Sequence, residues 1–177
     1  MKKALILMIV LIACQAQTTP TSVASTSVSK EKLAEDTEPA EMKGMLAAHN
    51  KWRKELNLPP LVWSNELAAV AQKWANKLKR KGCKMEHSSN QFGENLYWSS
   101  GMAPTPEHVV GSWASEKKYF NFKTKKCKGN WSKCGHYTQL IWKSTKKVGC
   151  AKVTCGGEQV WVCNYDPPGN YTGMDPY

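Results

Sequence analysis

Apolar residues recur at helical spacing in the first part of the folded region. Between residues 41 and 56 they stand three or four positions apart, which predicts an amphipathic helix, at Met42, Met45, Leu46, His49, Trp52 and Leu56. Pro59 and Pro60 follow closely. Proline lacks an amide donor and disfavours helix in the residue before it, so this helix ends before them.

Two further helices are expected. Ser64 is a good N-cap for a helix that ends at Gly82, with one apolar face formed by Leu67, Val70, Ala71, Trp74 and Leu78. Thr105 and Pro106 begin a third helix, since proline is allowed at the first helical position. Its apolar face is formed by Val109, Val110, Trp113 and Phe120.

The C-terminal part has the pattern of β-strands. The segments Lys147–Cys155 and Gln159–Tyr165 are rich in valine and alternating apolar residues, and Gly156 and Gly157 stand between them. Two such segments around a Gly-Gly turn predict a hairpin. Helices therefore come first and antiparallel strands last, which is an α+β arrangement. The tail, Pro167–Tyr177, is rich in proline and glycine and is expected to be irregular.

The N-terminus has the pattern of an export signal. Two lysines precede the apolar run Ala4–Ala13, and small residues follow, so residues 1–16 resemble a secretory signal. Signal peptidase would cut after Ala16. Alternatively, Leu11–Cys14 resembles a bacterial lipobox, in which Cys14 is lipidated. We favour the lipid anchor, because the Ser/Thr-rich residues 17–40 have the composition of a flexible tether. Residues 41–177 then form the folded domain.

Composition narrows the function classes. The chain has 177 residues, 41% of them hydrophobic, and a formal net charge of +11. Outside residues 1–16 no apolar run approaches the roughly 20 residues of a membrane span, which excludes a protein with several spans. The motifs GxxxxGK[ST], GxGxxG and HExxH are absent, so no nucleotide or other organic cofactor is expected. The net positive charge could attract nucleic acid. However, the chain is expected to be exported and has no nucleic-acid-binding motif, so nucleic acid is not expected as its partner.

Six cysteines remain when Cys14 is set aside, and an even number in an exported chain indicates three disulfides. Six cysteines allow 15 connectivities. Spacing favours Cys127–Cys134 across a short polar loop and Cys150–Cys163 across the predicted hairpin, which leaves Cys83–Cys155. A cysteine metal site is the alternative, but the chain contains no CxxC pair.

Four ionisable residues are candidates for chemistry: His87, Glu94, Glu116 and His136. Two imidazoles are suitable ligands for zinc or another divalent cation, and carboxylates orient such ligands or act as general bases. Spacing alone leaves two other interpretations open. The four residues are an acid–base pair without metal, or they are unrelated polar residues.

Several motifs resemble those of the CAP superfamily, which groups cysteine-rich secretory proteins, wasp antigen 5 and plant pathogenesis-related class 1 proteins. They are His49-Asn-Lys-Trp-Arg53, Gly93-Glu-Asn-Leu96, Gly135-His-Tyr-Thr-Gln-Leu-Ile-Trp142 and Val162-Cys-Asn-Tyr-Asp-Pro-Pro-Gly-Asn-Tyr171. They cover about residues 42–177, and the plant class 1 type is the most similar. The lipobox-like N-terminus is not part of the plant pattern and suggests a bacterial relative.

The resemblance implies an α-β-α sandwich with a small antiparallel sheet between helical layers. It also implies a cleft that holds a tetrad of two histidines and two glutamates, in which the histidines bind metal. His87, Glu94, Glu116 and His136 match all four positions. The C-terminal segment resembles the one from which plant relatives release a signalling peptide, which implies a cut here after Asp166.

A basic and aromatic segment follows the third predicted helix. Residues 117–133 contain seven lysines and no acidic residue, a composition that suits an anionic lipid surface. The matching loop of some relatives is implicated in sterol binding. The candidate ligand or membrane contacts are Lys118, Tyr119, Phe120, Phe122, Lys125, Lys126 and Trp131. Alternatively, this is a solvated basic loop whose aromatic residues pack inward.

The sequence therefore leaves three alternative functions. The first is an extracellular, monomeric binding protein for a lipid or sterol-like molecule, an anionic envelope polymer or a host protein. The second is a metal-dependent hydrolase that uses the tetrad. The third is a precursor of a C-terminal signalling peptide. Whether the chain is an enzyme is left open by its sequence.

Overall fold

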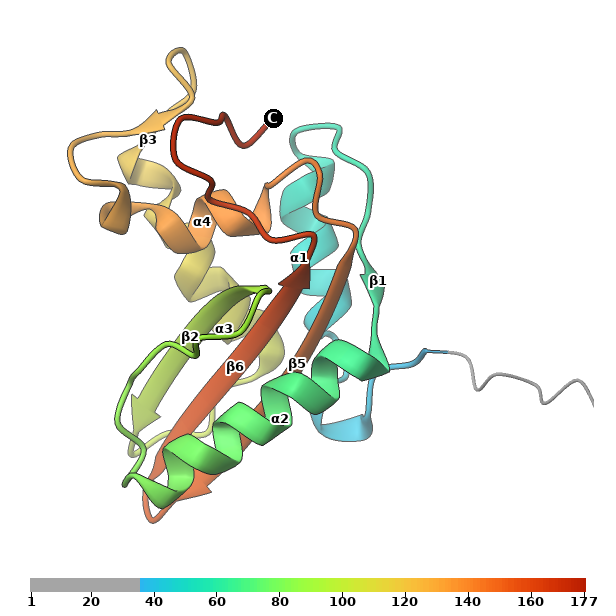
Figure 1. Cartoon of the computed structure of the whole chain (residues 1–177), viewed down its shortest axis with the longest axis vertical. Coiled ribbons are helices and arrows are strands. Elements are labelled where there is room, and N and C mark those ends of the chain that lie inside the picture. Colours follow the sequence, from blue (N-terminus) through green and yellow to red (C-terminus); the bar gives the residue numbers. More distant parts are fainter. Residues whose placement is uncertain (1–35) are drawn as a thin grey trace, which may run out of the picture. The chain divides into compact units, whose positions relative to one another are not determined.

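A four-stranded sheet organises the domain, with the strand order β1-β5-β6-β2 (Figure 1). The computed structural model describes residues 36–177. The strands are β1 (Val62–Trp63), β2 (Gly93–Ser100), β5 (Lys147–Cys155) and β6 (Glu158–Asp166). Strand β6 pairs antiparallel with both β5 and β2, whereas the short β1 pairs parallel with β5. The expected antiparallel sheet is thus extended by one parallel edge strand.

The predicted hairpin is confirmed. Strands β5 and β6 are joined at Gly156 and Gly157, and Cys150 lies directly opposite Cys163. Successive residues of β6 face opposite sides of the sheet. Val160 and Val162 pack in one hydrophobic cluster, and Trp161 packs in the other.

Helices cover both faces of the sheet, so the predicted α-β-α sandwich is confirmed. One layer is α2 (Asn65–Arg80), which packs on β5 and β6 through the cluster that contains Ala71, Ala75 and Leu78. The other layer contains α1 (Met45–Lys54), α3 (Pro106–Ala114) and α4 (Gly135–Leu140). As expected, the Ser64 hydroxyl accepts a hydrogen bond from the amide of Leu67 at the start of α2.

The first and third helices are shorter than predicted. A 3₁₀ turn, η1 (Ala40–Met42), precedes α1, and Gly44 at φ +96° separates the two. Helix α3 ends at Ala114 and continues as the 3₁₀ helix η2 (Ser115–Tyr119). Phe120, expected on the helix, instead begins the small sheet of β3 (Phe120–Asn121) and β4 (Lys126–Cys127), which η3 (Trp131–Lys133) follows.

Three disulfides connect these elements and have the pairing that the sequence suggested. Cys127–Cys134 joins β4 to the residue before α4, and Cys150–Cys163 joins β5 to β6. Cys83–Cys155 connects the segment after α2 to the end of β5, across 72 residues of chain. The α+β fold with three disulfides is therefore confirmed.

Residues that precede the expected domain boundary at residue 41 already contact the fold. The Glu38 carboxylate accepts hydrogen bonds from the amides of Gly44 and Leu46, and so satisfies free donors at the start of α1, where Gly44 offers no side chain. Residues 36–40 of the expected tether are thus in contact with the fold. The secretory signal, Cys14 and the remaining tether lie outside the described residues. No helix within residues 36–177 has the length and apolarity to cross a membrane.

Candidate functional site

The first His–Glu pair lies at the beginning of β2. Glu94 is the second residue of this strand, and its Oε1 lies 2.7 Å from Nδ1 of His87 and 2.9 Å from the amide nitrogen of Ser88. The Glu94 side chain is only 6% exposed, whereas that of His87 is 63% exposed. The buried carboxylate therefore holds an imidazole that reaches solvent.

These contacts shift the pKa of both partners. Burial acts to raise the pKa of Glu94, but the hydrogen bonds from His87 and Ser88 outweigh it, and the net pKa is lowered. The hydrogen bond to Glu94 raises the pKa of His87, against the effect of burial. The pair therefore favours a carboxylate beside a protonated imidazole.

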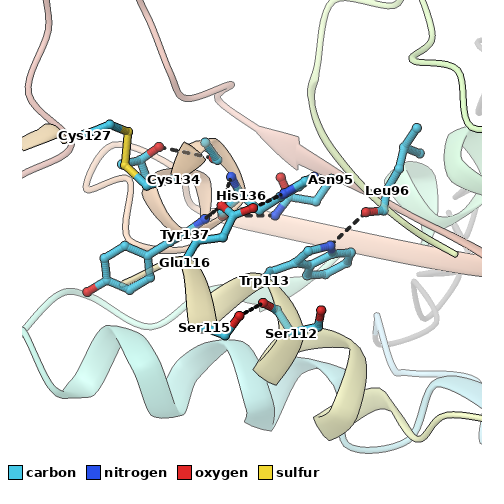
Figure 2. Close-up of polar contacts among 12 residues, drawn as sticks. Asn95, Leu96, Ser112, Trp113, Ser115, Glu116, Cys127, Cys134, His136 and Tyr137 are labelled. Carbon is cyan, nitrogen blue, oxygen red and sulfur yellow. Dashed lines mark hydrogen bonds and ion pairs between the residues drawn. A yellow bond between two sulfur atoms is a disulfide. The ribbon is translucent and has the colours of Figure 1, made fainter. Parts of the chain in front are cut away.

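The second pair joins η2 to α4 (Figure 2). Oε1 of Glu116 lies 2.7 Å from Nδ1 of His136, and Oε2 accepts hydrogen bonds from the amides of His136 (2.9 Å) and Tyr137 (3.2 Å). One carboxylate thus fixes both the imidazole and the first turn of α4. The Trp113 ring stacks on the imidazole, with centroids 6.3 Å apart and planes 19° apart.

Both histidines line one cavity of about 370 Å³, together with Glu94. We name it the tetrad cavity. Each imidazole uses Nδ1 for a carboxylate, and among residues 36–177 neither Nε2 has a hydrogen-bond partner. Glu116 supports His136 from outside the cavity lining. The fold therefore brings all four expected residues together as two pairs, with two ring nitrogens available to a ligand.

This site offers fewer side-chain ligands than most metal sites do. Within residues 36–177 no group of three or more His, Cys, Asp or Glu side chains is arranged to hold an ion. A usual catalytic zinc site has three protein ligands. The carboxylate on each Nδ1 is nonetheless the arrangement that orients metal-binding histidines. Two imidazoles in one cavity, each with Nδ1 engaged by a carboxylate, leave only Nε2 for a cation, and His87 would have to lose its proton first. A divalent cation at this site stays a prediction.

A buried polar chain lies behind the site. His49 is fully buried; its Nδ1 lies 2.7 Å from the Met45 carbonyl oxygen, and its Nε2 lies 2.9 Å from the Tyr165 hydroxyl. The side-chain Nδ2 of Asn95 donates to that hydroxyl and to the backbone carbonyl of His136, both at 3.2 Å. The position of His136 is thus linked to α1 and β6 as well as to Glu116.

A second and larger cavity, of about 500 Å³, lies between the basic segment and the C-terminal tail. We name it the aromatic cavity. Its apolar wall consists of Trp131, Trp142, Tyr171, Met174 and Pro176, and Lys125 and Lys126 also line it. Trp131 and Asn170 line both cavities. The two cavities therefore share part of one wall.

The tail is docked on α4 and forms part of this wall. The Asn170 side chain donates to the carbonyl of Gly135 (2.8 Å) and accepts from the Thr138 hydroxyl (2.6 Å). The amide of Gly169 donates to the buried side chain of Gln139 (3.1 Å). Residues after Asp166 thus contribute to the described fold, and their release as a peptide stays a prediction.

The candidate residues of the basic segment separate into three groups. Lys125, Lys126 and Trp131 line the aromatic cavity. Lys118, Tyr119 and Phe122 are exposed but line neither cavity. The prediction that Phe120 contacts a ligand or membrane is wrong. Phe120 is 2% exposed and packs against Tyr137 and Tyr177, so it belongs to the core.

Sequence reasoning did not single out several residues of the site. Asn95, Gln139, Trp142 and Asn170 have contacts that only the fold creates. All four stand inside the motifs that carry the CAP resemblance. Their place within these motifs was thus the one available signal.

Comparison with known families matches residues 46–165 to the cysteine-rich secretory protein family. Among curated proteins, pathogenesis-related protein PR-1 of Medicago truncatula is 44% identical over 134 residues, which cover 75% of this chain and 76% of the relative. Pathogenesis-related protein 1C of Nicotiana tabacum is 43% identical over 133 residues, 75% of this chain and 78% of the relative.

Solved structures show the same fold. NaASP2, whose crystal structure was determined with Zn²⁺, has a TM-score of 0.69 at 26% identity, over 81% of this chain and 88% of that protein. The hookworm platelet inhibitor has a TM-score of 0.65, also at 26% identity, over 81% and 78% of the two chains. The family match lies within the described residues, and the bacterial lipoprotein-like N-terminus stays a prediction.

Proposed function

This chain belongs to the cysteine-rich secretory protein family, and from that premise we propose that it is an extracellular binding protein for a lipid or sterol-like ligand. Secretion is supported by the description of the family and by the signal-like residues 1–16. Lipid anchoring through Cys14 stays a prediction, as do an anionic envelope polymer or host protein as partner and the monomeric state.

The aromatic cavity is the observation that carries the proposal. Ligand pockets of roughly 300–1,000 Å³ with mostly apolar walls and a few polar groups are typical small-molecule sites. This cavity measures about 500 Å³ and has two tryptophans and a tyrosine in its wall. Its lysines supply the polar contacts. An apolar molecule with a polar or anionic head group matches this lining.

An equilibrium titration of the purified, oxidised protein with a fluorescent sterol tests the proposal, with a fluorescent fatty acid as comparator. We expect saturable binding of at least one probe that unlabelled ligand displaces. Tyr171 is half exposed in the cavity wall, so Tyr171→Ala should raise the Kd roughly tenfold. Trp98→Ala is the matched control, because Trp98 is 43% exposed but lines neither cavity. Absence of saturable binding would refute the proposal.

A metal-dependent hydrolase is the second candidate, favoured by the two Nε2 atoms in the tetrad cavity that have no hydrogen-bond partner in the described part of the chain. His87 and His136 would hold Zn²⁺ or another divalent cation, which supplies Lewis-acid chemistry when bound. Glu94 and Glu116 orient the two rings through Nδ1. Glu94 also lines the cavity, so its carboxylate is placed where a general base would be needed.

Calorimetric titration with Zn²⁺ examines the metal separately from any activity. We expect weak binding that His87→Gln or His136→Gln abolishes and that His108→Gln leaves unchanged, because His108 is an exposed residue of α3 outside the tetrad cavity. Hydrolysis of peptide or ester substrates that requires the metal and is lost in His136→Gln would establish the enzyme. Zinc binding without turnover would leave the binding function as the better account.

A further inference from the structure

One end of the domain gathers most of the exposed apolar side chains. Residues 36–177 contain nine large hydrophobic residues that are well exposed. Five of the nine belong to residues 117–133 and 171–177, with exposed fractions of 40–68%: Tyr119, Phe122, Trp131, Tyr171 and Met174. Exposed apolar groups concentrated in this way mark an interaction surface.

The two segments lie together in space. Nζ of Lys125 lies 2.6 Å from the backbone oxygen of Tyr177 and 4.8 Å from the centroid of its ring. Trp131, Tyr171 and Met174 line the same cavity. Figure 1 shows the β3 region and the C-terminal tail at one end of the domain, away from the turn between β5 and β6. We name this surface, residues 117–133 with 171–177, the basic aromatic face.

Charge on this face has one dominant sign. Residues 117–133 contain seven lysines and no acid, and residues 171–177 add one acid, Asp175. Lys117 pairs with Glu55 at 2.7 Å, and Lys125 contacts Tyr177. Lys118, Lys123, Lys126 and Lys133 are exposed and have no carboxylate partner among residues 36–177. A large positive potential therefore faces solvent here.

We propose that the basic aromatic face docks the protein on an anionic lipid membrane. Lysines attract anionic head groups within a Debye length of the surface. Tryptophan, tyrosine and phenylalanine beside them insert their apolar rings at the level of the head groups. Dissolved polyanions would use the lysines but would leave Phe122 and Met174 without a role. The aromatic cavity opens among the same side chains, so docking places its mouth at the lipid. This inference does not require that the cavity hold a sterol.

Sedimentation with lipid vesicles tests the proposal. The full protein is mixed with vesicles of pure phosphatidylcholine or of an equimolar mixture with phosphatidylglycerol. We expect binding to the mixed vesicles alone, and its loss in about 1 M salt, where the Debye length is only about 3 Å. Lys118→Gln with Lys123→Gln should weaken binding roughly 25-fold, since each lysine near anionic lipid contributes about fivefold. Phe122→Ala should weaken it roughly fivefold.

The controls place the same changes outside the basic aromatic face. Lys73→Gln with Lys79→Gln removes two exposed lysines of α2, and Trp98→Ala removes an exposed aromatic of β2; neither should alter binding. Failure to bind mixed vesicles would overturn the proposal, as would equal losses in the control variants. Vesicle binding that depends on the lysines but not on Phe122 would refute the insertion of aromatic rings, because the contact would then be electrostatic alone. Lys118, Lys123 and Phe122 lie outside both cavity linings, so these variants leave sterol binding to be measured independently.

Discussion

Acidification should destabilise this domain through one buried histidine. His49 has no exposed surface, and its ring lies near those of Trp113 and Tyr165, at centroid distances of 6.1 and 5.6 Å. Burial lowers its pKa to about 4; the hydrogen bond with Met45 opposes this shift and the charge of Arg53 adds to it. In the neutral ring, Nδ1–H donates to the Met45 carbonyl and Nε2 accepts from the Tyr165 hydroxyl.

The sign and size of the effect follow from the two pKa values. In the unfolded chain His49 binds its proton near pH 6.5, whereas in the folded chain it does so only near pH 4. Between these values the unfolded state holds more protons, so stability falls as the pH falls through this window. The pKa difference corresponds to about 3 kcal/mol, which is present in full above pH 6.5 and lost by about pH 4.

Denaturant unfolding at pH 7 and pH 4 measures this contribution. Wild type should lose about 3 kcal/mol more stability between the two pH values than His49→Gln does, because the variant removes the titrating ring but retains every carboxylate. His108→Gln should behave like wild type, because His108 is exposed. Equal losses in wild type and His49→Gln would show that the buried ring does not govern acid sensitivity.

Three further predictions concern stability. Arg53→Met should cost about 3–5 kcal/mol in denaturant unfolding, because the buried guanidinium donates to four backbone carbonyls; an unchanged midpoint would contradict this role. Gly149→Ala should cost about 1–3 kcal/mol, because a Cβ there would lie 2.2–2.6 Å from the backbone at the start of α2; Gly157→Ala, with open space around it, is the control in the same thermal melts. Cys83→Ser should cost about 2–5 kcal/mol, since its disulfide closes the longest of the three loops, and a midpoint equal to wild type would contradict this.

The sequence alone indicated the parts of the fold that rest on local patterns. Helix α2 begins after Ser64 as its capping residue predicts, and β5 and β6 turn at the predicted glycines. Strand β2 was not predicted, because only its pairing along β6 defines it as a strand. Helix α4 has six residues, too few for periodicity to be read. Phe120 appeared to continue a helical face, but the chain turns there into β3.

The site was predictable in composition but not in arrangement. His87, Glu94, Glu116 and His136 were chosen through the family resemblance, since their spacing alone did not favour a metal over other interpretations. Which glutamate supports which histidine depends on η2 reaching the start of α4 and on β2 lying beside residue 87. The aromatic cavity depends on contacts between segments about 40 residues apart in sequence, and no local pattern indicates such contacts.

Photolabelling with a diazirine-bearing sterol tests the central claim most directly, since it identifies both binding and its location. We expect label on peptides that contain Trp131, Trp142 or residues 170–176, and its loss when excess unlabelled sterol is present. Label that does not compete, or that falls on α2 or on the turn between β5 and β6, would contradict a lipid-binding function for the aromatic cavity.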